Sequence, residues 1–143
     1  LNQSEIGIDL SALRLVRSGM YDVSNGENGT ARASKIALNE IAMSAKTGTS
    51  QVRNITKKER ETGVIANEDL PYNRRDHALF VGFAPYDRPK YAIAVVVEHG
   101  GGGSKVAAPI ARDIMLRALY GDIPPLEAYP EEQRSKIAKR FKD

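Results

Sequence analysis

The 143-residue chain contains no cysteine, which excludes disulfide bonds and thiol chemistry. It also lacks a long hydrophobic run. The longest apolar stretches, 78–84 and 91–97, are each seven residues long, whereas a membrane-spanning helix needs roughly 20 apolar residues. No secretory signal peptide is recognisable. Because the first residue is leucine rather than methionine, we expect the sequence to be an excised or processed piece of a longer protein.

The chain also has little excess of charge of one sign. The 21 lysine and arginine residues nearly balance the 18 aspartate and glutamate residues, which leaves a formal charge of +3. The two basic stretches, 53–60 and 134–142, contain glutamate or alternate with apolar residues. A nucleic-acid-binding domain instead concentrates its basic residues in a stripe with interleaved aromatics. We therefore expect both stretches to be solvated surface, and we expect no nucleic-acid partner.

Apolar periodicity and turn residues predict an α/β (α+β) chain in which helices pack on an antiparallel sheet. In chain order, the expected elements are a helix over 4–20, a loop over 24–30, a shorter helix over 31–41, a strand over 42–52, a long loop over 53–76, strands over 77–85 and 90–98, and a helix that starts near 106–108 and ends at Gly121. Asp9 or Ser11 is expected to cap the first helix. Pro109 must lie in the first turn of the last helix, because a proline deeper in it would remove a hydrogen bond.

Two long helices are expected to bury regularly spaced apolar residues. These residues are Leu10, Leu13, Val16 and Met20 in the first helix and Val106, Ile110, Ile114, Ala118 and Leu119 in the last. Residues 122–143 are expected to form a charged tail, with a loosely attached helix after Pro130.

The strand over 91–97 is nearly continuously apolar, which predicts that both of its faces are covered. A sheet of only three strands does not readily bury both faces of an apolar strand. The sheet is therefore expected to need more strands than this chain supplies. An exposed apolar edge invites pairing with another chain. We therefore expect a homodimer, or pairing with a missing partner chain, through 91–97. A monodisperse monomer in light scattering at high concentration would contradict this expectation.

One group of residues can carry chemistry: Lys46, Thr47, Gly48 and Thr49 follow one another in a predicted strand. The lysine ammonium can hold a carboxylate or polarise a neighbouring hydroxyl, and the threonine hydroxyls can orient the same anion. Gly48 leaves no side chain to block a substrate that lies along the strand. The amide N–H that follows it can point at a developing oxyanion. Taken alone the run is a weak signal, because it occurs often in ordinary strands.

The surrounding sequence resembles serine penicillin-binding proteins and β-lactamases, whose last motif is a Lys-Thr-Gly strand. The similarity is carried by the segments 16–23, 29–31, 44–52, 77–85, 91–98, 100–103 and 107–111, in the family's chain order. It covers roughly residues 10–120 and is greatest to class B penicillin-binding proteins of the penicillin-binding protein 2 type, the elongation transpeptidases. The resemblance implies that residues 1–121 are the C-terminal part of a transpeptidase domain and that 122–143 are a tail.

The resemblance also implies roles for the motif residues. Lys46 would face the active-site serine network and help hold the substrate carboxylate. Thr47 and Thr49 would supply hydroxyls to the carboxylate of a stem peptide or a β-lactam, and Gly48 would leave room for the ligand. The Thr49 N–H would supply half of an oxyanion hole. Pleat alternation places Thr47 and Thr49 on the face opposite Lys46 and Gly48, so only local twist or an edge position can bring both sets to one cleft.

The family's other two motifs, Ser-x-x-Lys with the nucleophilic serine and Ser-x-Asn, do not occur in this sequence. We therefore expect the chain alone to acylate and turn over nothing. For a longer protein that includes the missing N-terminal part, the resemblance implies a serine-type peptidoglycan D,D-transpeptidase that cross-links stem peptides and binds β-lactams without a metal or organic cofactor. It also implies an inner-membrane anchor, a periplasmic catalytic domain and contacts with membrane proteins of the elongation complex.

Two other function classes remain open. A class A or D β-lactamase shares the Lys-Thr-Gly strand but hydrolyses the acyl-enzyme, although the long 53–76 segment counts mildly against so compact an enzyme. A non-catalytic scaffold module with the same fold is the second alternative. Isolated serines and histidines are more often structural than catalytic, and these two histidines lack the spacing of a metal site. The residues concerned are Ser44, Ser50, Ser104, His77 and His99.

Overall fold

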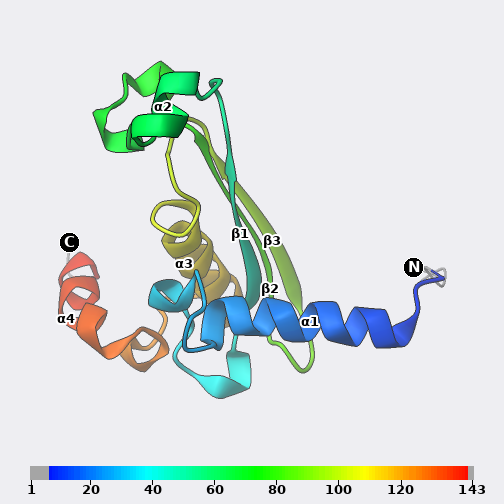
Figure 1. Ribbon diagram of the computed structural model, residues 1–143. Helices are drawn as coiled ribbons and strands as arrows, with labels where there is room; N and C mark the ends of the chain where they lie inside the picture. Colours follow the sequence, from blue (N-terminus) through cyan, green and yellow to red (C-terminus); the bar gives the residue numbers. More distant parts are fainter. Residues whose placement is uncertain (1–6, 142–143) are drawn as a thin grey trace.

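The computed structural model describes residues 7–141 and shows a three-stranded antiparallel sheet with helices packed on it, as the sequence predicts (Figure 1). The longer elements are α1 (Leu10–Asn25), β1 (Ser44–Ser50), α2 (Lys57–Thr62), β2 (His77–Ala84), β3 (Tyr91–Val97), α3 (Ala107–Tyr120) and α4 (Glu131–Arg140). None of the helices in these residues is long and apolar enough to cross a membrane.

The three strands lie in the order β1–β2–β3, so β1 and β3 are the two edges of the described sheet. Ser44 of β1 pairs with Phe83, and Ser50 pairs with His77. Strands β2 and β3 form the predicted hairpin, in which Ala78 pairs with Val97. All three predicted strands are therefore confirmed, and the strand that carries Lys46 to Thr49 has one free edge.

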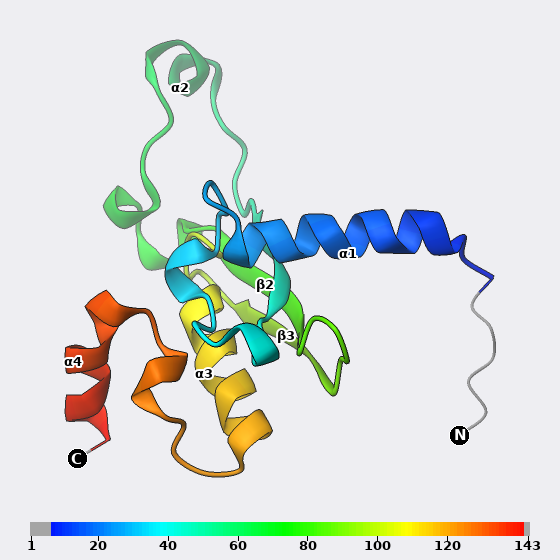
Figure 2. The same cartoon turned by 90° about the horizontal axis from the view of Figure 1, so that it is seen from below.

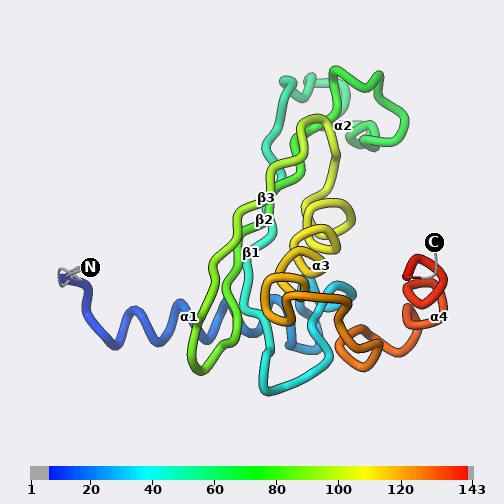
Figure 3. Tube along the Cα trace, turned by 180° about the vertical axis from the view of Figure 1, so that it is seen from behind, coloured from blue at the N-terminus to red at the C-terminus, as the bar shows by residue number. Residues whose placement is uncertain are grey.

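Helix α3 lies against one face of the sheet through small residues (Figure 3). Its buried apolar residues are Ala107, Ala108, Ala111, Met115 and Leu116, which pack with Phe80 and Ala45 of the sheet. The bounds of α3 and the place of Pro109 in its first turn are confirmed. The predicted apolar stripe is right only at its two ends: Val106 and Leu119 pack against the core, whereas Ile110 and Ile114 are exposed. Alanine side chains let the helix backbone approach the sheet more closely than isoleucines would.

Helix α1 begins and ends later than the sequence predicts. Asp9 caps it as expected, because its carboxylate accepts a hydrogen bond from the Ser11 amide at 3.1 Å. The predicted start, residues 4–6, lies outside the described residues. Gly19 does not end the helix, which continues to Asn25. The Asn25 side chain donates to the Met43 carbonyl at 3.0 Å, so a contact with the chain just before β1 supports the extra turn.

Three of the four apolar residues predicted to be buried in α1 are exposed, so the predicted stripe is wrong here too, although Val23 near the end of the helix packs against the core. Leu10 is 64% exposed, Val16 is 58% exposed, and Leu13 is exposed as well. Arg17 also contacts the sheet, and its guanidinium lies 5.7 Å from the centroid of the Phe83 ring. Figure 2 shows the N-terminal half of α1 extending away from the sheet. The apolar face of α1 is left uncovered by the described residues.

The predicted helix over 31–41 is wrong. Two short 3-10 turns, Arg32–Ser34 and Asn39–Ile41, occupy this stretch. Between them, the Ala37 amide donates to the Ala128 carbonyl at 2.9 Å. That long-range bond uses a backbone group that a regular helix would need for itself, so tertiary contact overrides the local preference.

The segment after Pro124 packs against the body of the chain. Tyr129 and Ile137 belong to the core, and Ile137 is only 4% exposed. Gln133 of α4 accepts a hydrogen bond from Arg112 at 2.7 Å and donates to the Ala33 carbonyl at 2.6 Å. The helix predicted after Pro130 is confirmed, but its loose attachment is wrong.

Strand β3 is covered on one face only. Ile93, Val95 and Val97 pack against the core, whereas Val96, on the other face, is 62% exposed. Val81 of the neighbouring strand β2 is exposed on the same outer face. The expectation that both faces of β3 are covered is therefore wrong for the described chain. The expectation that the chain supplies too few strands to cover both faces agrees with this exposure.

Candidate active site

The free edge of β1 carries the candidate chemistry. Lys46 is exposed, and its Nζ donates a hydrogen bond to the Thr47 carbonyl oxygen at 2.6 Å. That carbonyl is therefore accessible on the open side of the strand. In an antiparallel ladder the N–H and C=O of one residue point to the same side, and the side alternates from one residue to the next. The Thr49 amide, two residues on, accordingly faces the same open edge.

Backbone bonds that flank β1 support this alternation. The Ala42 carbonyl, before the strand, accepts from the Tyr86 amide at 2.9 Å. The Val52 amide, after the strand, donates to Asp76 Oδ1 at 3.2 Å. Both partners lie on the β2 side, so even-numbered positions direct their backbone groups toward β2 and odd-numbered positions direct them outward. The Thr49 N–H is thus directed outward, away from β2.

The Thr47 hydroxyl is held from outside the strand. It lies 2.9 Å from the Thr30 hydroxyl, which belongs to the loop after α1. Thr47 pairs with Phe80 and shares its face, whereas Lys46 pairs with Val81 and points to the opposite face. Lys46 nevertheless reaches the free edge of β1, because its Nζ bonds the outward Thr47 carbonyl. The sequence offered no signal for the contact with Thr30.

Gly48 lies under the glycine-rich run that leads into α3. The backbone of Gly103 packs so closely on β1 and β2 that a Cβ there would lie less than 3.0 Å from the carbonyl oxygens of Gly48 and Leu79. The backbone of the chain itself therefore approaches β1 closely at Gly48, on the α3 face. A Cβ on Gly48 would lie 3.2 Å from the Leu79 Cβ, so this position is also tight.

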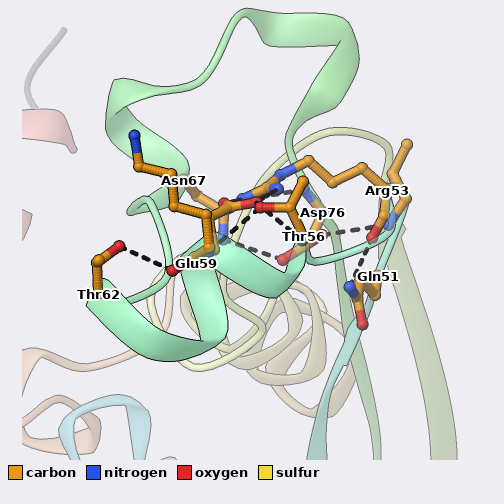
Figure 4. A network of polar contacts seen from close by, with 9 residues as sticks. Gln51, Arg53, Thr56, Glu59, Thr62, Asn67 and Asp76 are labelled. Atoms are coloured by element: carbon orange, nitrogen blue, oxygen red, sulfur yellow. Dashed lines mark hydrogen bonds and ion pairs between the residues drawn. The ribbon is translucent and has the colours of Figure 1, made fainter.

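The chain between β1 and β2 is more ordered than the predicted long loop. Thr56 and Glu59 form a reciprocal capping box at the start of α2. The Glu59 carboxylate also receives two hydrogen bonds from the Arg53 guanidinium, at 2.6 and 2.9 Å (Figure 4). A Thr-x-x-Glu pattern is a known helix start, so the sequence did contain a signal for α2 that the apolar pattern alone missed.

The Arg53–Glu59 pair makes the folded segment sensitive to acid. Hydrogen bonds from Arg53 and from the Thr56 backbone lower the pKa of Glu59 from 4.5 to about 2. A carboxylate whose pKa is lowered by folding stabilises the fold above its unfolded pKa and loses this contribution as the pH falls through its folded pKa. We expect hydrogen exchange of the Thr56 amide to accelerate between pH 4.5 and 2, after correction for intrinsic exchange.

The Glu59→Gln variant provides the control for this prediction. It keeps the shape of the side chain but has no carboxylate to protonate, so protection of the Thr56 amide should no longer change in this pH range. An equal acid transition in both proteins would show that another group is responsible.

The two histidines stabilise the turn after β3. The His99 amide donates to His77 Nδ1 at 2.9 Å, and the two rings lie 4.8 Å apart. His99 has a φ of 55°, a backbone conformation that is uncommon outside glycine, and the bond to His77 holds it there. Ser44 is fully buried, so its hydroxyl does not reach a substrate. In residues 7–141, no group of three or more His, Asp or Glu side chains is arranged to hold a metal ion.

Comparisons with known proteins agree on one family. The model of the penicillin binding protein transpeptidase domain matches residues 2–116. Peptidoglycan D,D-transpeptidase MrdA of Haemophilus influenzae is 35% identical over 132 residues, which are 91% of this chain and 20% of that protein. The protein of the same name from Salmonella typhimurium is 41% identical over 101 residues, 71% of this chain and 15% of that protein.

Solved structures give the same answer. Penicillin-binding protein 2 (PBP2) of Helicobacter pylori, in its complex with MreC, matches with a TM-score of 0.60 and 34% identity, over 85% of this chain and 20% of that one. PBP2 of Pseudomonas aeruginosa, in complex with WCK 5153, matches with a TM-score of 0.57 and 35% identity, over 87% and 22%. The chain spans about a fifth of the length of these relatives. It belongs to the penicillin binding protein transpeptidase domain family, as a fragment of the PBP2 type.

Proposed function

We propose that this chain is the C-terminal part of a serine-type peptidoglycan D,D-transpeptidase and supplies the Lys-Thr-Gly side of its active site. The observation that carries the proposal is the free edge of β1, where Lys46, Thr47 and the outward Thr49 amide lie together in a chain of this family. The relatives are named D,D-transpeptidases, which supports cross-linking of stem peptides as the reaction of the longer protein.

The proposed roles are those that the family resemblance implies, and the position of these groups at the free edge of β1 supports them. The Lys46 ammonium and the Thr47 hydroxyl bind the terminal carboxylate of the donor peptide or of a β-lactam. The Thr49 N–H stabilises the oxyanion that forms when a serine attacks the carbonyl carbon, and removal of one such donor typically raises the barrier by about 2.7–4 kcal/mol. The serine hydroxyl comes from a Ser-x-x-Lys segment outside this sequence. The scissile amide then breaks, and the terminal amino acid of the donor leaves with a protonated amine. The acyl-enzyme passes its acyl group to an amine of a second stem peptide, which frees the serine.

Uncovered apolar surface supports the view that the chain works within a larger domain. The outer face of the sheet exposes Val81 and Val96, and α1 exposes Leu10 and Val16. Large uncovered apolar patches usually mark an interaction surface. We propose that the missing N-terminal part of the same domain covers these residues and pairs with the free edge of β3, with a second copy of this chain as the alternative partner.

Location and further partners are proposed from the relatives. The H. pylori relative forms a complex with MreC, which supports a partner from the elongation complex for the longer protein. A transpeptidase that acts on peptidoglycan works outside the inner membrane, so we propose a periplasmic domain on a membrane-anchored protein. Fractionation of cells that express the full-length protein tests this, and recovery in the cytosol would overturn it.

Labelling with fluorescent penicillin tests the proposed function. The full-length protein should form a stable covalent band on a denaturing gel, and the 143-residue chain should not, because it has no Ser-x-x-Lys. A label that is lost within minutes would indicate a β-lactamase-like hydrolase instead. If neither protein is labelled, the transpeptidase proposal falls and a non-catalytic scaffold becomes the better description.

The contact between Thr30 and Thr47 yields a prediction for the full-length protein. In Thr30→Val, the Thr47 hydroxyl loses its partner and is less well oriented toward the ligand carboxylate. A hydrogen bond contributes about 0.5–1.5 kcal/mol, so the second-order acylation rate by a penicillin should fall about fivefold. Thr30→Ser should restore it. The loss should be smaller with the methyl ester of the same penicillin, and an equal loss with both would contradict a role through the carboxylate.

A further inference from the structure

A groove of about 400 Å³ lies directly beyond the C-terminal end of β1. It is formed by the end of β1 and by the segment 51–76, which rises above the sheet in Figure 1. Its lining includes Thr49, Gln51, Ile55, Val64, Ile65 and Leu70. Since Thr49 belongs both to the motif strand and to the groove, the groove adjoins the candidate active site at this residue.

Hydrogen bonds within the segment fix the walls of the groove. Arg53 is tied to Glu59 by two hydrogen bonds. Asn67 and Asp76 bind each other reciprocally: the Asp76 amide donates to Asn67 Oδ1 at 2.8 Å, and Asn67 Nδ2 donates to Asp76 Oδ2 at 3.2 Å. Figure 4 shows this network on the side of the segment next to the strand. The groove is thus held open by contacts that need no ligand.

The side chains that line the groove indicate what kind of ligand it can bind. Arg53 is paired with Glu59. The Asp76 carboxylate accepts hydrogen bonds from the Val52 amide and the Asn67 side chain. The walls also present exposed aliphatic side chains, because Val64 is 55% exposed and Ile65 is 48% exposed. An aliphatic ligand segment would remove these side chains from water, which is favourable. A groove whose wall carries exposed aliphatic side chains and whose polar groups are hydrogen-bonded within the chain suits an aliphatic segment of a ligand.

The proposed function gives the direction of the substrate. A donor peptide whose terminal carboxylate lies at Lys46 and Thr47, and whose scissile carbonyl lies at the Thr49 amide, runs along β1 toward Gln51. A strand rises about 3.3 Å per residue, so Gln51 lies about 7 Å beyond Thr49. Consecutive Cα atoms of a peptide are about 3.8 Å apart, so the residues just before the scissile bond reach Gln51. They would enter the groove.

We propose that this groove is a binding subsite for the aliphatic part of the donor peptide on the N-terminal side of the scissile bond. The inference rests on the proposed function, since that function sets the direction of the substrate. Val64 and Ile65 are its specificity-determining residues. They favour a long donor over a short one, and they make no contribution to the acylation chemistry itself.

The test compares two synthetic donors on the full-length protein. Both end in D-Ala-D-Ala; the short one carries only an acetyl group before it, and the long one carries the preceding stem-peptide residues. The readout is the ratio of kcat/KM for the long donor to that for the short donor. We expect Val64→Ser and Ile65→Ser each to lower this ratio about tenfold, as loss of apolar contact in a pocket does. Ile123→Ser changes an isoleucine that is 54% exposed after α3 and should leave the ratio unchanged.

The outcomes separate the subsite from the function. A wild-type protein that accepts neither donor overturns the proposed function and the subsite with it. A wild-type protein that accepts both, with the same ratio in all three variants, overturns the subsite alone. A ratio that falls equally in Ile123→Ser also overturns it, because the effect would then not depend on the groove.

Discussion

Gly103→Ala is expected to lower the free energy of unfolding of this chain by about 3 kcal/mol, the upper end of the range for an overpacked site. The new Cβ would lie less than 3.0 Å from the carbonyl oxygens of Gly48 and Leu79, a distance that real Cβ atoms essentially never show. Both obstacles are backbone atoms in paired strands, so no side chain can rotate away. The N-terminus of α3 or the two strands must move instead.

Gly102→Ala is the matched control for this substitution. A Cβ at Gly102 would meet no heavy atom of the described chain within 4 Å, and its backbone lies outside the left-handed region. Such a glycine-to-alanine change shifts stability by no more than about 1 kcal/mol. Urea denaturation of the three proteins gives the comparison. Equal stability of Gly103→Ala and Gly102→Ala would show that the glycine run does not pack on β1 as described.

Thr49→Pro is expected to lower the acylation rate of the full-length protein by about 100- to 1,000-fold, the usual effect of removing one oxyanion donor. Proline has no amide N–H, and it is tolerated in sheets only where that N–H faces away from the ladder. The outward direction of the Thr49 amide meets this condition, because the Thr47 carbonyl on the same side is free to accept a bond from Lys46. The variant should therefore fold.

Two controls separate the amide of Thr49 from its side chain. Thr49→Val removes the hydroxyl but keeps the N–H, so its acylation rate should stay well above that of Thr49→Pro. The melting temperature of each protein shows whether it has folded. If Thr49→Pro folds and is acylated as fast as Thr49→Val, the Thr49 amide has no part in the oxyanion hole.

The parts of this fold that sequence predicts are those set by local patterns. The hairpin of β2 and β3 follows from two short apolar runs around a turn, and the bounds of α3 follow from Pro109 and Gly121. The strand β1, which carries the Lys-Thr-Gly motif, is likewise predicted from its own residues. The sequence also contained the Thr56–Glu59 capping box, although apolar periodicity gives no sign of so polar a helix.

The wrong predictions concern which helix faces are buried. Burial of a face depends on residues that are far away in the sequence. Apolar periodicity identifies a face that prefers burial, but it does not say whether this chain supplies the cover. Leu10 and Val16 are exposed for that reason. Helix α3 packs on the sheet through its alanines, which allow the helix backbone to lie closer to the strands than its isoleucines would. The contact between Thr30 and Thr47 joins a loop and a strand that share no sequence pattern, so only the structure reveals it.

The hydrogen bonds of Asp76 with Val52 and Asn67 join the two ends of the segment 51–76, and this affects how the region can vary in length. The Asp76 side chain accepts a hydrogen bond from the Val52 amide, where the segment leaves the sheet. The two ends of the segment are therefore held together whatever the length of the chain between them. Doubling a flexible loop costs only about 0.6 kcal/mol in closure entropy. Residues can therefore be inserted around α2 with little effect on the pairing of Ser50 with His77. The border of the groove is free to diverge between relatives while the register of the motif strand stays fixed.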